Sequence, residues 1–554
     1  MCVDLSQGVA LGYYIPRLQR FDSTRCAREI ECGRDARGPS EELARILQER
    51  GCRVFSYTHL PFMKSNASHS NSIDLFAIAR QSMIDAGFVP DLSDAVAEQL
   101  KAIEAAATSH PLSEARDLRK LLWSSIDDAK SRDLDQVEYA EALANGDTRV
   151  LVGIADVDSL VPAGSAIDKH AEENTTSVYT GVKTFPMLPE ELSTGLTSLN
   201  QDQDRRAVVT EMVFSSDGAM KSSDIYPALT KNYAKLAYES VGDWLDGKSG
   251  VPSNVAAVAG LEAQIRLQFD AAKALAEMRK QHGALELGTI QASPRVNDEG
   301  KVIELDVVEQ NGARDLIANF MIAANVAMAQ FLEAKGGPTL RRVVHTPRYW
   351  SRIVEIAAEL HEQLPADPDS RSLAEFLARQ RAADPLHFPD LSLAIVKALG
   401  PGEYAVQLPG ETGEGHFGLA VQDYTHSTAP NRRFADLVTQ RLVKAALAGK
   451  PVPYSADQLK QIAEHCTERE SAARKVERKM RKVAAALLLR DQVGHEFKAI
   501  VTGVSPKGTF ARVLSPPVDG RVMRGEHGLR VGEKVDVKLL SVEPERGFID
   551  FART

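Results

Sequence analysis

The sequence is poor in cysteine and has no long hydrophobic run. Only five cysteines occur in 554 residues, and none are spaced as CxxC, so neither a disulfide scaffold nor a cysteine zinc site is indicated. Apolar stretches fall well short of the roughly 18 residues that a membrane span requires. With 44% hydrophobic and 26% charged residues, the composition is typical of a soluble globular protein. We expect a cytoplasmic protein without membrane association.

Lysine is absent from the first 62 residues, although this segment contains nine arginines and four of the five cysteines. The segment lacks the apolar core of a signal peptide, and its acidic residues are untypical of a transit peptide. We therefore expect residues 1–62 to be a poorly ordered extension, with Met63 as the functional start.

The formal net charge of −10 means that a polyanionic partner must be held by a local basic surface. A predicted helix at 464–490 offers such a surface through Arg474, Lys475, Arg478, Lys479, Arg481 and Lys482. Two interpretations of this helix stay open: a surface that faces RNA, and a merely solvated helix face.

Hydrophobic patterning predicts an α+β fold. Helical spacing occurs at 74–106, 257–281 and 314–334. Short apolar runs of strand type occur between them, including 150–155 and 208–214, and the second run is followed by an Asp217-Gly218 turn. Beyond residue 494, short alternating segments separated by glycine and proline predict a small β-barrel.

The segment IDDAKSRDLDQ at 126–136 concentrates four carboxylates, those of Asp127, Asp128, Asp133 and Asp135. Neighbouring acids repel one another unless a cation neutralises them. Hard cations such as Mg²⁺ prefer oxygen ligands of this kind, and Asp133 and Asp135 project to the same side of an extended chain. A solvated acidic loop is the alternative.

Several long motifs, in order along the chain, resemble the ribonuclease II (RNB) family. They are GIADV at 153–157, SVY at 177–179, PMLPEELS at 186–193, LTSL at 196–199, HFGLA at 416–420, YTH at 424–426 and TAPNRRFADL at 428–437. The resemblance covers about residues 115–450, and the terminal barrel resembles an RNA-binding OB fold. The expected organisation is an extension at 1–62, a helical region at 63–114, an RNB-like catalytic domain at 115–463, a basic helix at 464–493 and an OB-like barrel at 494–554.

The resemblance implies a processive, metal-dependent 3′-to-5′ exoribonuclease that hydrolyses single-stranded RNA to nucleoside 5′-monophosphates. We expect Mg²⁺ or Mn²⁺ as the metal, no organic cofactor, and a monomer. Asp127 and Asp133 match the family's metal-binding acids, and Asp135 matches the acid that family members cannot do without. Arg432 matches the arginine on the scissile phosphate, where a guanidinium stabilises developing charge. A surface cation is the alternative for Arg432.

Three further residues match substrate contacts of the family. Tyr179 matches the aromatic that clamps the terminal base, and Tyr238 matches one that stacks further along the strand; a buried core tyrosine is the alternative for each. Glu477 matches a glutamate near the active site, and its alternative is an i,i+4 partner on its own helix.

The sequence departs from the family at the acidic motif, where Gln136 replaces the second of two consecutive acids. An amide is a weaker ligand for a hard cation, so we expect weaker metal binding unless Glu138 or Asp128 compensates. The runner-up function is therefore a catalytically impaired RNB-like protein that binds RNA. A third candidate is a metal-dependent phosphodiesterase for another nucleotide substrate.

Other departures concern the contacts with RNA. Ala318 and Asn319 stand where the family usually has two glutamates, and residues 291–298 lack an aromatic partner for Tyr179. The two cold-shock barrels typical of the family are also missing ahead of the catalytic region. We expect these differences to alter the preferred RNA length.

Overall fold

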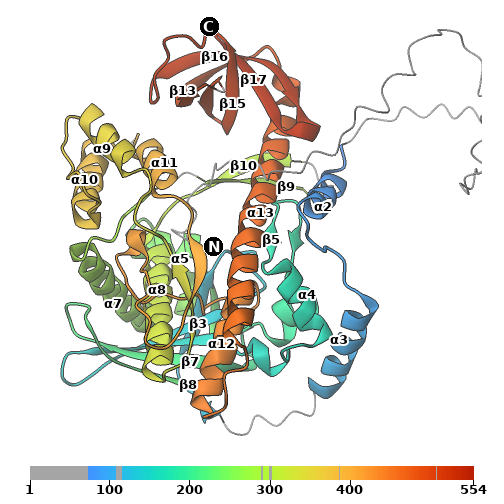
Figure 1. Ribbon diagram of the computed structural model, residues 1–554, viewed down its shortest axis with the longest axis vertical. Helices are drawn as coiled ribbons and strands as arrows, with labels where there is room; N and C mark the ends of the chain where they lie inside the picture. Colours follow the sequence, from blue (N-terminus) through green and yellow to red (C-terminus); the bar gives the residue numbers. More distant parts are fainter. Residues whose placement is uncertain (1–72, 108–114, 289–290, 298–301, 386, 507) are drawn as a thin grey trace, which may run out of the picture. The chain divides into compact units, whose positions relative to one another are not determined.

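The computed structural model describes residues 73–554, except for 108–114, 289–290, 298–301, 386 and 507 (Figure 1). Residues 74–554 belong to a single unit of the fold. The predicted extension at 1–62 and the proposed start at Met63 lie outside the described residues. The predicted helical lead-in contains α2 (Leu75–Asp85) and α3 (Asp94–Ala107).

The core of the large domain is a closed ring of five strands. The strands of this sheet are β1 (Arg116–Asp117), β2 (Trp123–Asp127), β3 (Gln136–Ala142), β4 (Thr148–Ala155), β7 (Asp204–Phe214) and β8 (Met220–Ala237). The ring closes because β8, 18 residues long, pairs antiparallel with β7 and parallel with β2. β1 pairs with β8 outside the ring. The ring brings the end of β2 beside the start of β3, and the acidic loop joins them.

Helices cover the ring on two sides. One hydrophobic cluster joins the ring to α5 (Tyr238–Leu245), α7 (Leu261–Gln281) and α8 (Gly312–Ala334), and a second joins it to α12 (Phe434–Leu447) and the start of α13 (Ala456–Leu489). The predicted helix at 257–281 starts later, at Leu261, because Gly260 has a left-handed φ of 84°. A short helix, α6 (Ser253–Ala256), precedes it.

Among the described residues, one helix, α8, is long and apolar enough to cross a membrane. In the structure, 72% of its most apolar window is buried inside the protein. Its apolar side chains, including Leu316 and Phe320, pack in the core with the ring. The same composition therefore serves a core helix, as expected for a helix that is hydrophobic nearly all round.

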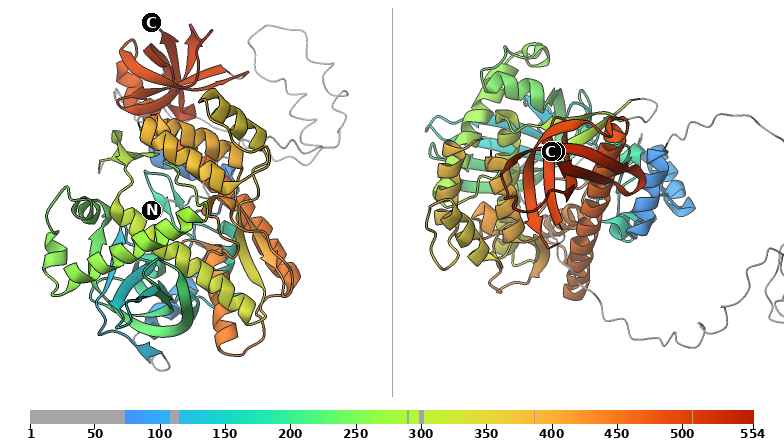
Figure 2. Two further views of the ribbon diagram at one scale, coloured as in Figure 1. Left: turned by 90° about the vertical axis from the view of Figure 1, so that its left-hand side faces the viewer. Right: turned by 90° about the horizontal axis from the view of Figure 1, so that it is seen from above.

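The C-terminal segment forms a closed barrel with strand order β13-β14-β15-β17-β16. Its strands are β13 (Glu496–Ser505), β14 (Gly508–Leu514), β15 (Pro517–Arg524), β16 (Lys534–Glu543) and β17 (Phe548–Arg553). The long helix α13 starts at a capping box formed by Ser455 and Gln458, and its last turns place Ala486 and Leu489 in the barrel core. Figure 2 shows the barrel, in red, from two sides. These elements confirm the predicted α+β class with its terminal barrel.

The remaining elements complete the large domain. They are α4 (Ala166–Asn174), β5 (Val178–Tyr179), β6 (Thr184–Phe185), a π-helix (Glu191–Leu196), β9 (Gln291–Val296), β10 (Val302–Val308), β11 (Thr339–Val343), α9 (Trp350–Glu359), α10 (Ser370–Ala383), α11 (Phe388–Leu399) and β12 (Glu403–Gln407). Helices α9, α10 and α11 share a separate hydrophobic cluster, which we did not predict from the sequence.

The predicted turn at Asp217-Gly218 positions α7 against the ring. Gly218 has a φ of 85°, and a Cβ at this position would lie 2.4 Å from the carbonyl oxygen of Ala274 in α7. Gly218→Ala is therefore expected to lower the free energy of unfolding by about 2 kcal/mol, through left-handed strain and the clash. Urea denaturation measures this effect. Gly250→Ala is the control, because a Cβ there meets nothing within 4 Å; equal losses in both variants would contradict the prediction.

Candidate active site

The structure brings all seven predicted site residues to one cavity of about 1300 Å³. They are Asp127, Asp133, Asp135, Tyr179, Tyr238, Arg432 and Glu477. Their elements lie far apart in sequence: the β2 end and acidic loop, β5, α5, the turn before α12, and α13. Gln136 also lines this cavity.

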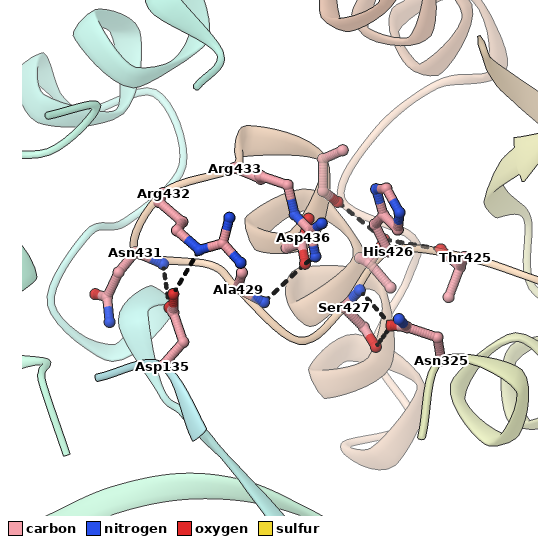
Figure 3. Close-up of polar contacts among 12 residues, drawn as sticks. Asp135, Asn325, Thr425, His426, Ser427, Ala429, Asn431, Arg432, Arg433 and Asp436 are labelled. Atoms are coloured by element: carbon pink, nitrogen blue, oxygen red, sulfur yellow. Dashed lines mark hydrogen bonds and ion pairs between the residues drawn. The ribbon is translucent and has the colours of Figure 1, made fainter. Parts of the chain in front are cut away.

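Asp135 contacts the turn that carries Asn431 and Arg432 (Figure 3). Its side chain is 2% exposed; Oδ1 accepts a hydrogen bond from the backbone N–H of Asn431 at 2.9 Å, and Oδ2 lies 3.3 Å from Nε of Arg432. Burial raises the pKa of Asp135 to about 7, and the repulsion of Asp133 adds to this, whereas the attraction of Arg432 opposes it. The carboxylate is therefore costly to ionise without an added cation.

The turn that carries Arg432 is fixed by its own contacts. The backbone N–H of Ala429 and the guanidinium of Arg433 both donate to Oδ1 of Asp436, each at 2.8 Å. Upstream, the N–H and Oγ of Ser427 donate to Oδ1 of Asn325 in α8 at 2.8 Å. These contacts, seen in Figure 3, hold Arg432 in place before any ligand binds.

Tyr179 is held at both ends. Its hydroxyl donates to Oδ2 of Asp133 at 3.0 Å, and its backbone N–H donates to Oε1 of Glu477 at 3.0 Å. Burial raises the pKa of Glu477, although the bond from Tyr179 opposes this shift. Glu477 thus reaches from α13 to β5 rather than only pairing along its own helix, and it fixes the position of the predicted base clamp.

Tyr238 has features of both interpretations made from the sequence, a tyrosine that stacks on RNA bases and a buried core tyrosine. It lines the cavity, yet it is only 1% exposed and belongs to the core cluster around α8. The guanidinium of Arg314 lies 4.3 Å from its ring centroid and forms ion pairs with Asp128 at 3.0 Å and Glu239 at 2.9 Å. Its stacking role stays a prediction, since Arg314 occupies one position against the ring.

The two acids considered as substitutes for Gln136 lie in different surroundings. Asp128 lines the cavity and pairs with Arg314. Glu138, opposite Ser124 in the ring, is fully buried and is not among the residues that line the cavity. Within the part of the chain that the structure describes, neither of its carboxylate oxygens has a hydrogen-bond partner. Burial, with repulsion from Asp127, raises the pKa of Glu138 well above its usual range. Glu138 is therefore a poor substitute for a cavity-wall acid.

The donor chemistry of the cavity fits a hard cation in part. The side chains of Asp127, Asp133 and Asp135 offer only oxygen atoms as ligands, and Oδ2 of Asp135 accepts no hydrogen bond from any residue that the structure describes. In the described part of the chain, however, no three His, Cys, Asp or Glu side chains are gathered closely enough to hold a metal ion. One or two carboxylates suffice for Mg²⁺ when water and substrate phosphate complete its shell. The residues fit that kind of site.

Basic residues of two helices, α13 and α7, line the cavity, and only those of α13 were predicted from the sequence. Of the six cations predicted between 474 and 482, Arg474 lines the cavity, paired with Glu470 of the same helix. The other five are not among the lining residues. Three cations of α7 that were not predicted do line it: Lys273, Arg279 and Lys280. Their helical spacing within 257–281 was the available signal.

A closed ring of strands that carries the Asp135–Arg432 ion pair, joined to a closed C-terminal barrel, is the architecture of an RNB domain followed by an S1 domain. The RNB domain family matches residues 115–449, and the RNase II-type exonuclease C-terminal S1 domain matches residues 495–554. The chain belongs to the RNB family.

Several proteins with similar sequences are named Ribonuclease R. "Ribonuclease R 1" of Lactococcus lactis is 29% identical over 84% of this chain and 59% of its own length, and Ribonuclease R of Escherichia coli K12 is 30% identical over 79% and 57%. The chain thus spans less than two thirds of these relatives. Mycoplasma genitalium RNase R in complex with ribose methylated single-stranded RNA has a TM-score of 0.75 at 24% identity, covering 87% of this chain and 78% of its own. Yeast Ssd1, a pseudonuclease, has a TM-score of 0.61 at 16% identity, covering 84% and 57%.

The raised pKa of Asp135 predicts a pH-dependent stability in metal-free protein. Between about pH 4 and 7 the folded state keeps a proton that the unfolded state has lost, so this stabilisation is present at low pH and is lost as pH rises through 7. Relative to Asp135→Asn, the wild type is expected to lose on the order of a few kcal/mol between pH 5 and 8. Denaturant unfolding in EDTA measures this difference. Asp457→Asn, at an exposed position in α13, should track the wild type; a pH-independent difference for Asp135→Asn would refute the assignment.

Proposed function

We propose that the protein is a metal-dependent 3′-to-5′ exoribonuclease that hydrolyses single-stranded RNA to nucleoside 5′-monophosphates in RNA turnover. The observation that carries this proposal is the ion pair between buried Asp135 and half-buried Arg432 at the wall of a large cavity that Tyr179 also lines. The Ribonuclease R relatives and the RNA complex of the M. genitalium protein support it.

The site residues have distinct expected roles. Nε of Arg432 faces Asp135, so its terminal nitrogens are the donors left to bind phosphate oxygens and stabilise charge as the phosphodiester breaks. Tyr179 offers an aromatic face to a terminal base, and Asp133 and Glu477 fix its position. Sequence-independent stacking suits an enzyme that acts on successive nucleotides.

RNB nucleases are metal-dependent hydrolases, and we propose Mg²⁺ or Mn²⁺ as the metal here. One or two of the carboxylates of Asp127, Asp133 and Asp135 would hold it, and water and substrate phosphate would complete its shell. Bound there, a divalent cation would neutralise the acids, polarise the phosphate and lower the pKa of attacking water. The C-terminal barrel would add a second, salt-sensitive hold on the RNA.

The runner-up is an RNA-binding protein with impaired hydrolysis, and Gln136 at the cavity wall favours it. Yeast Ssd1 shows that this fold occurs in a pseudonuclease. A phosphodiesterase for another nucleotide substrate would leave the RNA-binding type of barrel without a role.

The first test uses 5′-labelled single-stranded RNA with Mg²⁺, analysed on a gel. Wild-type protein is expected to shorten the RNA from its 3′ end, and Asp135→Asn to reduce the rate by at least about 100-fold, because the central acid of the site is lost. Intact RNA with wild-type protein, together with retained binding, would support the runner-up instead. Turnover of small nucleotides without RNA binding would support the third candidate.

A second prediction concerns the amide at position 136. Gln136→Asp is expected to lower the Mg²⁺ concentration for half-maximal hydrolysis by about 10-fold, because a carboxylate replaces a weak ligand at the cavity wall. Metal titrations of the degradation rate measure the change. Gln461→Asp adds the same charge at an exposed position of α13 outside the cavity wall and should have no effect. An unchanged metal requirement in Gln136→Asp would show that position 136 does not contact the metal.

A further inference from the structure

One face of α7 gives the cavity a cationic wall distinct from the acidic loop. Lys273, Ala276, Arg279 and Lys280 all line the cavity, and their spacing of three, four and seven residues places them on one side of a helix. Nζ of Lys273 lies 4.0 Å from the ring centroid of Phe269, which also lines the cavity. The acids of the proposed metal site therefore share one cavity with a basic stripe.

Arg279 stands out because it has no carboxylate partner among the described residues. Its Nη2 donates to Oδ1 of Asn319, a neutral amide, and its Nε is buried without any hydrogen-bond partner. The buried arginines behave differently: Arg314, Arg341, Arg342 and Arg441 each form an ion pair with at least one Asp or Glu. A desolvated guanidinium without a counter-ion is costly, so Arg279 calls for an anion that the described residues do not supply.

Two acids, Glu286 and Asp315, influence the charge of Arg279, but each has another partner. Glu286 pairs with Arg381 at 3.4 Å, and Asp315 accepts a hydrogen bond from Gln310 at 2.6 Å. Burial lowers the pKa of Arg279, and Tyr424, Glu286 and Asp315 oppose this shift only from a distance. The neutral Ala318 and Asn319 of α8 line the adjoining part of the cavity.

We propose that Arg279 binds a backbone phosphate of the RNA strand as it crosses α7, with Lys273 and Lys280 contributing to the same hold. The inference rests on the proposed function, since it takes the cavity to be the RNA channel. A guanidinium matches phosphate geometry through paired N–H donors. Phosphate contacts carry no base information, so this wall would hold any sequence equally well.

The test measures binding of a fluorescent single-stranded oligoribonucleotide to the full chain in EDTA, over a range of salt concentrations. Arg279→Gln is expected to weaken binding about 10-fold at low salt. It should also reduce the slope of log Kd against log salt by about 0.7, the value for one phosphate contact on a single strand. Arg266→Gln is the matched control, because Arg266 lies on α7 outside the cavity wall and pairs with Glu262.

A second variant separates phosphate binding from a structural role. Asn319→Asp keeps the side-chain shape but gives Arg279 an internal counter-ion, so it should weaken binding and reduce the slope in the same way. In an Arg279→Gln background this substitution should not reduce the slope further. An unchanged slope in Arg279→Gln, with or without weaker binding, would overturn the inference. RNA binding without hydrolysis by the wild type would overturn only the proposed function.

Discussion

The burial of Asp135 is the constraint on which the rest of the site depends. A carboxylate that is 2% exposed needs partners, and it finds them 296 residues away in the N–H of Asn431 and, beside it, in the guanidinium of Arg432. Asp135 therefore ties the acidic loop to the turn before α12. Hydrogen bonds to Asp436 and Asn325 hold this turn. The arrangement of this part of the cavity wall therefore depends on one buried carboxylate and on contacts between segments far apart in sequence.

Much of the fold and of the site could be predicted because the sequence patterns that indicate them are local. Asp135 and Arg432 each lie in a long motif, and a motif fixes residue types at adjacent positions that must act together. The helix at 314–334 was predictable because apolar residues recur at helical spacing over six turns, and it runs from Gly312 to Ala334. The barrel was predictable from its alternating segments and its turns.

The features that could not be predicted depend on tertiary contacts, which a local sequence pattern does not indicate. The covering of Tyr238 requires Arg314 on α8 to be anchored by Asp128 and Glu239, which lie on other elements. Helices α9 to α11 are held by their own cluster, for which the sequence gives only short apolar runs. The burial of Glu138 is likewise a property of the closed ring. For Tyr238 and Glu138, the surroundings of the side chain are decided by segments distant in sequence.

The charge balance of the cavity links metal binding to RNA binding. Gln136, Ala318 and Asn319 are neutral where the family usually has acids, so the cavity wall holds fewer negative charges, while the cations of α7 remain. Because no three acidic, histidine or cysteine side chains in the described part of the chain form a complete metal cage, a cation here would complete its shell with water and with phosphate oxygens from the substrate. Metal and RNA would then each strengthen the binding of the other, since such coupling is reciprocal. In such a site, phosphate oxygens of the RNA would replace a missing carboxylate as ligands of the metal. Weaker metal binding by the free protein is therefore compatible with hydrolysis once RNA occupies the cavity.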